Sequence, residues 1–390
     1  MYRIKTLNKI SAAGLNLLDQ TRFQVGGDVE NEDGILVRSA AMHDYVFPDA
    51  LRAIARAGAG TNNIPIDRCS ENGIVVFNTP GANANAVKEL VIAALLLASR
   101  DIVGGCNWVR EQVADDSVKV EDVVEKGKAA FAGPELYHKT LGVIGLGAIG
   151  ALVCNVALEL GMDVYGYDPF LSVGAALRLD RHVHVVQDVE ELYKVSDYIT
   201  IHVPYTSDTK DFINADTIAK MKGHVRILNL ARGGQVNDDD MLEALDSGRV
   251  ARYVTDFPDE KICRGKNVIA MPHLGASTPE SEENCARMAA DQLKEYLVNG
   301  NIRNSVNLPN VVQEWSGICR LCLIHKNVPA MLTQITTILS DEGVNVENLT
   351  NKSKKEYAYT LVDVNSRIKD DVADELRAIP GMIRVRVLNH

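Results

Sequence analysis

The sequence predicts an α/β fold, with parallel sheets covered by helices followed by a small βαββαβ module. Three observations support this prediction. Short β-branched runs alternate with segments of helical periodicity up to residue 299, which is typical of parallel sheets with right-handed crossovers. A glycine-rich turn at 145–150 stands between a strand and a helix. The residues from 318 onward read strand, helix, strand, strand, helix, strand.

Length and charge set limits on what the chain can be. Its 390 residues are enough for two or three domains with full cores. Lys and Arg number 41 against 52 Asp and Glu, a net charge of −11 with no concentrated basic stretch, so a nucleic-acid partner is disfavoured. The longest apolar run, Leu90 to Ala98, is too short to span a membrane. We therefore expect a soluble, cytoplasmic protein with no membrane partner.

The seven cysteines predict neither a disulfide framework nor a metal site. They are odd in number, and only Cys319 and Cys322 form a C-x-x-C pair. A zinc site would need a second such pair. Because the pair lies in an apolar run, we expect buried free thiols in a reducing compartment and no bound metal.

The N-terminal segment predicts strands and helices in alternation. Residues 34–38 and 73–77 are short apolar runs typical of strands, whereas 48–57 has helical spacing. A helix is expected over 86–99. Its residues are apolar on every side, so we expect burial in a core or in a subunit interface.

The middle of the chain carries the clearest alternation. Strands are expected at 141–145, 163–168, 198–203 and 225–230, with a helix from the glycine turn to residue 159. Thr278 and Pro279 begin another helix that ends before Asn299-Gly300. A polar linker is expected at 301–309.

The last segment reads as a separate ferredoxin-like module. Strands are expected at 318–324, 344–349 and 357–364, and a final strand contains Ile383, Val385 and Val387. The two helices are expected at 329–339 and around Val372, Leu376 and Ile379.

The glycine turn predicts a dinucleotide site. Gly145 permits the tight turn, Gly147 lets a pyrophosphate approach the backbone, and Gly150 lets the helix pack on the strand. The helix N-terminus supplies free N–H groups for the phosphates. An acidic residue ends the next strand and should bind ribose hydroxyls, which favours NAD over NADP. The expected cofactor contacts at this turn are Gly145, Leu146, Gly147, Ala148, Ile149, Gly150 and Asp168.

Three side chains near expected strand ends suit hydride transfer to or from a carbon that bears oxygen. His273 would exchange the hydroxyl proton, and Glu260 would hydrogen-bond the other ring nitrogen. Arg232 would bind a substrate carboxylate with its planar fork. Ligands of open α/β sheets bind at this edge. The sequence thus predicts Arg232, Glu260 and His273 as catalytic residues.

These motifs resemble the D-2-hydroxyacid dehydrogenase family, and within it the phosphoglycerate dehydrogenases that carry a C-terminal ACT domain. The resemblance covers nearly the whole chain. It implies two flavodoxin/Rossmann-like domains, a homodimer or homotetramer, and NAD-dependent oxidation of 3-phospho-D-glycerate in serine biosynthesis. The implied domains are a substrate-binding domain (1–98 and 278–305), an NAD-binding domain (99–277), a linker (306–317) and an ACT domain (318–390).

The resemblance also implies roles for further residues. Arg38 would bind the substrate phosphate, and the backbone at Gly58 and Ala59 would approach the substrate carboxylate, with Arg232 and His273 completing the substrate contacts. L-serine is implied as an effector at His325, Asn327 and Asn345. The segments on the nicotinamide side are Val203, Pro204, Leu230, Ala231, Arg232, Asp256, His273 and Gly275.

Three positions depart from the family pattern. Ala148 stands where the family often has Arg or Asn, which removes a side-chain contact to the pyrophosphate. Thr255 stands where an aspartate usually holds the nicotinamide carboxamide, so either Asp256 serves instead or the contact is weaker. Ala330 replaces a glycine at the start of a helix in the ACT domain, where its methyl group would crowd an effector.

Several alternatives stay open at this stage. Another member of the class, such as a glyoxylate/hydroxypyruvate reductase, a D-lactate dehydrogenase or an erythronate-4-phosphate dehydrogenase, would keep the same three catalytic side chains. An NAD-sensing binding protein similar to the C-terminal-binding-protein corepressors would use the cofactor for assembly. A weak enzyme with a poorly placed nicotinamide would follow from Thr255.

Overall fold

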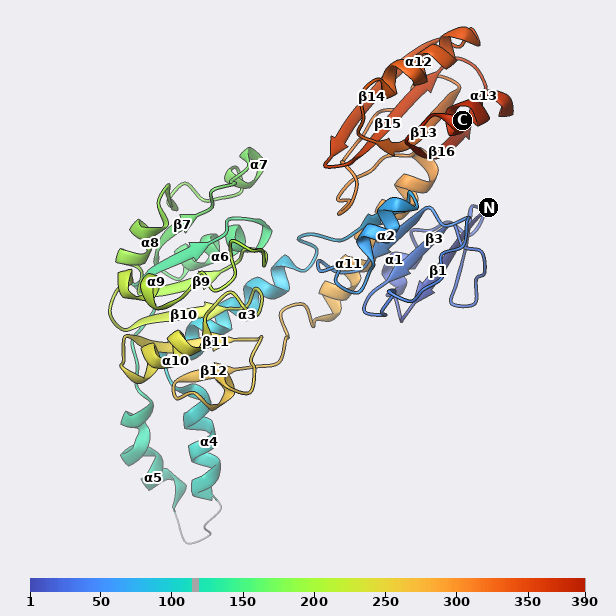
Figure 1. The fold of residues 1–390 in the computed structure, drawn as a ribbon. Coiled ribbons are helices and arrows are strands. Elements are labelled where there is room, and N and C mark those ends of the chain that lie inside the picture. The colour runs from blue at the N-terminus through green and yellow to red at the C-terminus, as the bar shows by residue number, and fades with distance from the viewer. Residues whose placement is uncertain (114–118, 390) are drawn as a thin grey trace. The chain divides into compact units, whose positions relative to one another are not determined.

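The computed structural model describes residues 1–113 and 119–389. These residues form two compact units, unit 1 (residues 1–83 and 279–390) and unit 2 (residues 84–278). The α/β prediction is confirmed: there are two parallel sheets and one smaller antiparallel sheet (Figure 1). The first part of unit 1 ends at residue 83, so the helix over 86–99 lies in unit 2, whereas the expected domain boundary followed residue 98.

Unit 1 contains a five-stranded parallel sheet in the order β2-β1-β3-β4-β5, a flavodoxin-like order. Residues 48–57, expected to be helical, instead contain strand β4. Ala53, Ile54 and Ala55 are fully buried between β3 and β5, and this burial overrides their helical spacing. The elements are β1 (Tyr2–Leu7), α1 (Ala12–Leu15), β2 (Phe23–Gly26), β3 (Gly34–Val37), β4 (Ala53–Arg56), α2 (Ile66–Glu71), β5 (Val75–Phe77) and α11 (Pro279–Asn299).

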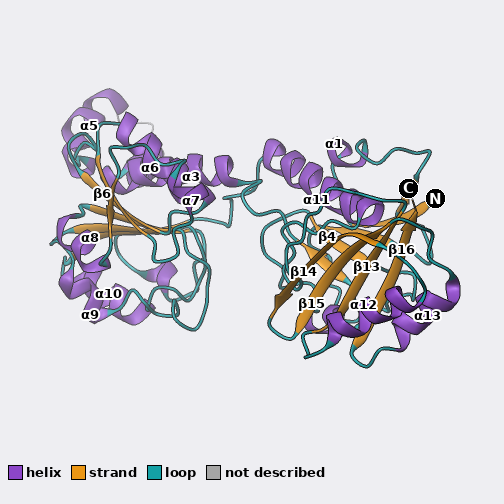
Figure 2. Cartoon of the chain, turned by 90° about the horizontal axis from the view of Figure 1, so that it is seen from above, coloured by secondary structure: helices purple, strands orange, loops and turns teal. Residues whose placement is uncertain are grey.

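The C-terminal module, residues 319–389, has the expected βαββαβ order. Its antiparallel sheet runs β14-β15-β13-β16, and helices α12 and α13 cover one face (Figure 2). The elements are β13 (Cys319–Lys326), α12 (Met331–Asp341), β14 (Val346–Lys354), β15 (Tyr357–Val364), α13 (Asp370–Ala378) and β16 (Met382–Asn389).

The other face of this sheet packs on the rest of unit 1. Cys322 and Tyr359 belong to the same buried cluster as Phe77 and Tyr296. Cys319 points to the opposite face, among the helices. Both thiols are buried and free, and because they lie on opposite faces of one strand they cannot pair. The module and the N-terminal sheet therefore share a continuous core.

The segment before the module is ordered rather than a plain polar linker. Ile302 and Val311 form a β-bridge. The Asn307 side chain accepts a hydrogen bond from the Val76 N–H (2.9 Å) and donates one to the Ile74 carbonyl (2.9 Å). Buried asparagines of this kind satisfy backbone groups at the edge of β5.

Two arginines of the module bind the C-terminal end of α11. Arg386 donates hydrogen bonds to the carbonyls of Tyr296 (3.3 Å) and Leu297 (2.9 Å). Arg320 donates to the Asn299 carbonyl (2.8 Å). The last carbonyls of a helix lack intrahelical partners and carry negative potential, so both guanidinium groups stabilise this end of α11.

Unit 2 is built on a seven-stranded parallel sheet, β12-β11-β10-β9-β6-β7-β8. Helices α3 and α6 lie on one face and α8, α9 and α10 on the other (Figure 2). The order reverses between β6 and β9, where doubly wound sheets bind their ligands. The elements are α3 (Ala84–Ser99), α4 (Ile102–Val113), α5 (Val120–Gly127), a 3-10 turn (Lys128–Phe131), β6 (Thr140–Ile144), α6 (Ala148–Glu159), β7 (Asp163–Tyr167), α7 (Val173–Ala176), β8 (His184–Val186), α8 (Val189–Val195), β9 (Tyr198–Ile201), α9 (Ala215–Lys220), β10 (Val225–Asn229), α10 (Asp238–Asp246), β11 (Val250–Thr255), a 3-10 turn (Ile262–Arg264) and β12 (Val268–Ala270).

Helix α3 is buried on one side only within this chain. Val91 and Leu95 are fully buried, whereas Leu96 is 38% exposed. Ile102 and Val103 at the start of α4 are each 43% exposed and continue this apolar surface. The sequence predicted burial of this helix in a core or in a subunit interface. The core of this chain covers the side with Val91 and Leu95 and leaves the side with Leu96 exposed. No helix in the described part of the chain is long and apolar enough to cross a membrane.

Candidate active site

The glycine turn has the geometry that a dinucleotide site needs. Gly145 has φ +95°, and a Cβ there would lie 2.6 Å from the His202 carbonyl oxygen. A Cβ on Gly150 would lie 1.9 Å from the Gly145 oxygen. Of the three glycines, Gly147 alone faces open space, with no atom within 4 Å of a Cβ. It is also the N-cap of α6, so free N–H groups meet an open surface suited to phosphate.

Asp168 is fixed beside this turn, directly after β7. One carboxylate oxygen accepts a hydrogen bond from the Leu146 N–H (2.9 Å) and the other accepts one from the Phe170 N–H (2.9 Å). Each carboxylate oxygen can accept a second bond. Asp168 can therefore also bind ribose hydroxyls, as the sequence predicts.

Asp256 is a buried carboxylate that can still accept hydrogen bonds. It is 2% exposed, and neither oxygen makes a hydrogen bond of normal geometry with a described residue. Burial raises its pKa to about 6, although the N–H groups of Asp256 and Gly275 and the charge of Arg232 act in the opposite direction. A carboxamide NH₂ would satisfy this group. The open glycine turn, Asp168 and Asp256 together fit NAD.

Arg232 lies in a turn shaped by a residue that the sequence analysis did not single out. The buried Asn229 side chain donates to the Arg232 carbonyl (2.9 Å) and accepts from the Ala231 N–H (3.2 Å). Gln235 is also buried and donates to the Val203 carbonyl (2.9 Å). A polar residue ending an apolar strand, as Asn229 does, is the signal that could have identified this positioning role.

His273 and Arg232 meet around one aromatic ring. The His273 and Phe257 ring centroids are 4.4 Å apart, and the Arg232 guanidinium carbon is 5.9 Å from the Phe257 centroid. Burial, and to a lesser extent the charge of Arg232, lowers the pKa of His273. The imidazole is therefore neutral at pH 7, which is the form that accepts a proton.

Glu260 does not join this group. Its side chain is exposed, and among the described residues no hydrogen bond or ion pair connects it to His273. The Asp259 carboxylate accepts the Ile262 N–H (2.7 Å) and starts a 3-10 turn at this point. Glu260 instead lines a separate cavity of about 540 Å³ together with Leu242, Asp246, Lys261, Arg264, Gly265 and Lys266.

The expected substrate residues of unit 1 are held by their own network. Arg38 follows β3 and forms an ion pair with Glu282 of α11 (2.7 Å). The loop with Gly58 and Ala59 is fixed by Asn78, whose side chain donates to the Ala59 carbonyl (2.6 Å). This loop therefore presents a defined backbone at the carboxyl end of β4.

The expected effector residues differ in their environments. His325 is buried, and its ring nitrogens lie 2.8 Å from the Lys326 carbonyl and 2.8 Å from the Thr360 hydroxyl. Burial lowers its pKa. Asn327 and Asn345 are exposed. Within residues 1–113 and 119–389, no three His, Cys, Asp or Glu side chains gather as a metal site.

The sequence matches a protein-family model and several curated enzymes. Residues 92–275 match the family described as "D-isomer specific 2-hydroxyacid dehydrogenase, NAD binding domain". The D-3-phosphoglycerate dehydrogenase of Methanocaldococcus jannaschii is 35% identical over 334 residues, covering 83% of this chain and 60% of that protein. The enzyme of the same name from Escherichia coli K12 is 34% identical over 409 residues, covering 98% of this chain and 95% of that protein.

A solved structure has the same fold. It is the NAD⁺-bound 3-phosphoglycerate dehydrogenase of Entamoeba histolytica, with a TM-score of 0.61 and 26% identity, covering 78% of this chain and 98% of that one. The chain spans only about 60% of the length of several curated relatives and nearly the full length of others.

Proposed function

Because this chain belongs to the D-isomer-specific 2-hydroxyacid dehydrogenase family, we propose that it oxidises 3-phospho-D-glycerate to 3-phosphohydroxypyruvate, with NAD as the hydride acceptor. The observation that carries this proposal is the placement of a neutral His273 and of Arg232 around Phe257, in the unit that bears the open glycine turn. A base and a carboxylate-binding cation are what oxidation of a 2-hydroxy acid requires.

Each residue has a defined part in the proposed reaction. NAD would be held by the glycine turn, Asp168 and Asp256, and when bound it would supply the acceptor for the hydride of C2. The neutral imidazole of His273 takes the hydroxyl proton, so the C2–O bond becomes a carbonyl and imidazolium forms. Arg232 binds the substrate carboxylate and polarises the C2 oxygen. The proposed role of Glu260 is to stabilise the imidazolium, and it requires the turn around Asp259 to bring the carboxylate to the ring.

The proposed phosphate ligand is Arg38, and its ion pair with Glu282 bears directly on substrate choice. Guanidinium groups bind phosphate strongly and in a bidentate manner. In the structure the Glu282 carboxylate occupies one side of Arg38. A dianionic phosphate would compete with this carboxylate for the same guanidinium group.

A substrate panel tests the proposal. NADH formation is measured with 3-phosphoglycerate, glycerate, D-lactate and 4-phosphoerythronate, with hydrazine present to trap the keto product because the oxidation is uphill. We expect turnover with 3-phosphoglycerate, and an Arg38→Gln variant should raise the KM for this substrate with little change for glycerate. Turnover with an unphosphorylated acid alone would contradict the phosphate role of Arg38. Tight NAD binding without turnover would instead favour an NAD-sensing binding protein.

The proposal extends to partners of the chain. The exposed apolar residues Leu96, Ile102 and Val103 support a homo-oligomer that covers α3 and α4. L-serine is the proposed effector of the C-terminal module, where His325 would exchange its present hydrogen bonds for the ligand. Initial rates against added L-serine test this, because a flat response would remove the effector from the proposal.

A further inference from the structure

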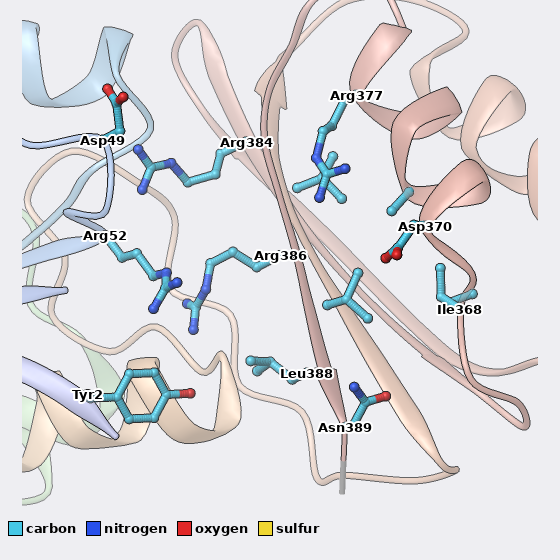
Figure 3. Close-up of a pocket in the computed structure, with 13 residues that line it drawn as sticks. Tyr2, Asp49, Arg52, Ile368, Asp370, Arg377, Arg384, Arg386, Leu388 and Asn389 are labelled. Atoms are coloured by element: carbon cyan, nitrogen blue, oxygen red, sulfur yellow. The ribbon is translucent and has the colours of Figure 1, made fainter. Parts of the chain in front are cut away.

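A cavity of about 570 Å³ in unit 1 surrounds the edge strand β16 of the C-terminal module, with the N-terminal part of the chain on one side and α13 on the other (Figure 3). Its size is within the range of small-molecule sites. The lining is rich in charge and contains four arginines and two aspartates. The lining residues are Tyr2, Asp49, Arg52, Ile368, Asp370, Ala373, Arg377, Arg384, Val385, Arg386, Val387, Leu388 and Asn389.

The arginines enter this cavity from separate elements. Arg384 and Arg386 project from one face of β16 toward Arg52, which comes from the N-terminal part of the chain (Figure 3). Arg377 lies on the other side of β16, on α13. Burial lowers the pKa of Arg384, and the positive charges of Arg386 and Arg52 contribute in the same direction, whereas Tyr296 and Asp49 act in the opposite direction. Arg384 therefore experiences the positive charges of both neighbouring arginines.

Ion pairing distinguishes the members of this group. Arg52 pairs with Asp33 (2.6 Å), and Arg377 pairs with Asp374 on its own helix. Among the described residues, Arg384 and Arg386 pair with no carboxylate. Arg384 donates to the Leu51 carbonyl. Arg386 is 7% exposed, lies over the Tyr296 ring (4.6 Å) and donates to the carbonyls at the end of α11. A guanidinium group has five N–H donors, so donors remain on both side chains.

Arg320, in the same contact region, differs from Arg384 and Arg386 in its ion pairing. Arg320 is fully buried and forms two hydrogen bonds with Asp363, at 2.6 and 2.7 Å. The fold thus neutralises Arg320, which also donates to the Asn299 carbonyl at the end of α11, with a buried carboxylate. Arg384 and Arg386 form no such ion pair with a described carboxylate, although Asp49 lines the same cavity and its charge acts on Arg384.

We propose that this cavity binds a small anion with at least two negative charges, of the phosphate or carboxylate type, held by Arg52, Arg384 and Arg386. The anion offsets the positive charges that act on Arg384 and uses the remaining donors of the three guanidinium groups. Because Arg52 belongs to the N-terminal part and the other two to the module, the bound anion also strengthens the contact between them.

Calorimetric titration of the full chain tests the proposal. Pyrophosphate and citrate are the probes, titrated at constant ionic strength with NAD saturating, so that the glycine turn is occupied. The protein carries Arg38→Gln and Arg232→Gln, which remove the proposed substrate anion sites. We expect one anion per chain. Adding Arg384→Gln should weaken binding by about tenfold or more, because hydrogen bonds from a charged donor contribute more than neutral ones.

Two further variants make the titration specific. Lys352→Gln removes one positive charge from β14, the opposite edge of the same sheet, where Lys352 is exposed; it should leave binding unchanged. Arg384→Lys keeps the charge but loses the planar fork, so its affinity should fall between that of the parent protein and that of the Arg384→Gln variant. The melting temperature of each variant without anion, compared with the parent, shows that the fold is kept.

The outcomes are distinct. Binding of pyrophosphate alone would support the proposal and identify a phosphate-bearing ligand, whereas binding of citrate alone would support it and identify a polycarboxylate. Absence of binding by both probes would overturn the proposal. So would equal affinities in the Arg384→Gln and Lys352→Gln proteins, since the anion would then be bound elsewhere.

Discussion

The protonation of His273 depends on two features of its surroundings, burial and the charge of Arg232, and both lower its pKa. The base form therefore persists below the ordinary value of 6.5, and kcat/KM for hydroxy-acid oxidation should fall only at lower pH. Arg232→Gln removes one cause and should move this acid limb upward, whereas Arg232→Lys keeps the charge and should leave it in place. pH–rate profiles in the NADH assay measure this.

The turnover itself should depend on the imidazole. His273→Gln should lower kcat by about 10²–10⁴-fold, the usual contribution of general acid–base catalysis, and leave the Kd for NAD unchanged. Near-normal turnover in this variant would contradict the proposed mechanism.

Asp256 couples the proposed cofactor site to stability. Because its folded pKa is raised to about 6 from 3.8, mainly by burial, the protonated form is favoured in the fold. Stability is then lost as the pH rises through this range. Asp256→Asn should stabilise the cofactor-free protein at pH 8 by up to about 3 kcal/mol and give no gain at pH 4. Urea unfolding at both pH values checks this, with exposed Asp246→Asn as the control; a gain that is equal at both pH values would contradict the assignment.

At the scale of an element, helix α12 begins on a strained residue. Ala330 is its N-cap and has φ +62°, in the left-handed region where an L side chain is disfavoured. We expect Ala330→Gly to stabilise the protein by up to about 1 kcal/mol, because glycine adopts this conformation without the Cβ clash. Thermal unfolding measures the change. The control is Ala378→Gly at the exposed end of α13, which should destabilise because glycine gains nothing in a helical conformation.

The elements that sequence patterns predicted well are those whose signal is local. The βαββαβ order followed in part from the alternation of Ile383, Val385 and Val387 and from the spacing of Val372 and Leu376, and the structure confirms it. The helix predicted over residues 48–57 was wrong. Ala53–Arg56 form a strand because they pair with β3 and β5 on either side, and this pairing outweighs their helical periodicity.

The candidate site also contains residues that a local motif identifies and residues that only the folded chain brings into place. Gly145 and Asp168 could be assigned from one contiguous motif, whereas Asn229 as the residue that shapes the Arg232 turn could not. The position of Glu260 depends on a 3-10 turn started by Asp259, and such a turn has no clear sequence signal. Contacts made between distant segments, such as Arg386 on the end of α11, are likewise invisible to local patterns.

On the scale of the whole molecule, the core predicts how the chain unfolds. In unit 1 the C-terminal module shares a buried cluster with α11 and the N-terminal sheet, through residues such as Cys322 and Tyr296. Unit 2 has separate cores. The ferredoxin-like module should therefore melt together with the rest of unit 1 instead of as an independent domain.

The prediction is that unit 1, including the C-terminal module, unfolds in one cooperative transition and unit 2 in another. Hydrogen exchange, measured by mass spectrometry at increasing urea concentrations, tests it. NAD should protect peptides of residues 84–278, because a ligand stabilises the unit that binds it.

Arg320→Met leaves the buried Asp363 unpaired and should lower the stability of residues 1–83 and 279–389 together, by about 3–5 kcal/mol. Adding Asp363→Leu removes the unpaired charge and should restore much of that loss. A lone early loss of protection in residues 319–389, with 1–83 unchanged, would show that the shared core does not couple the module to its sheet.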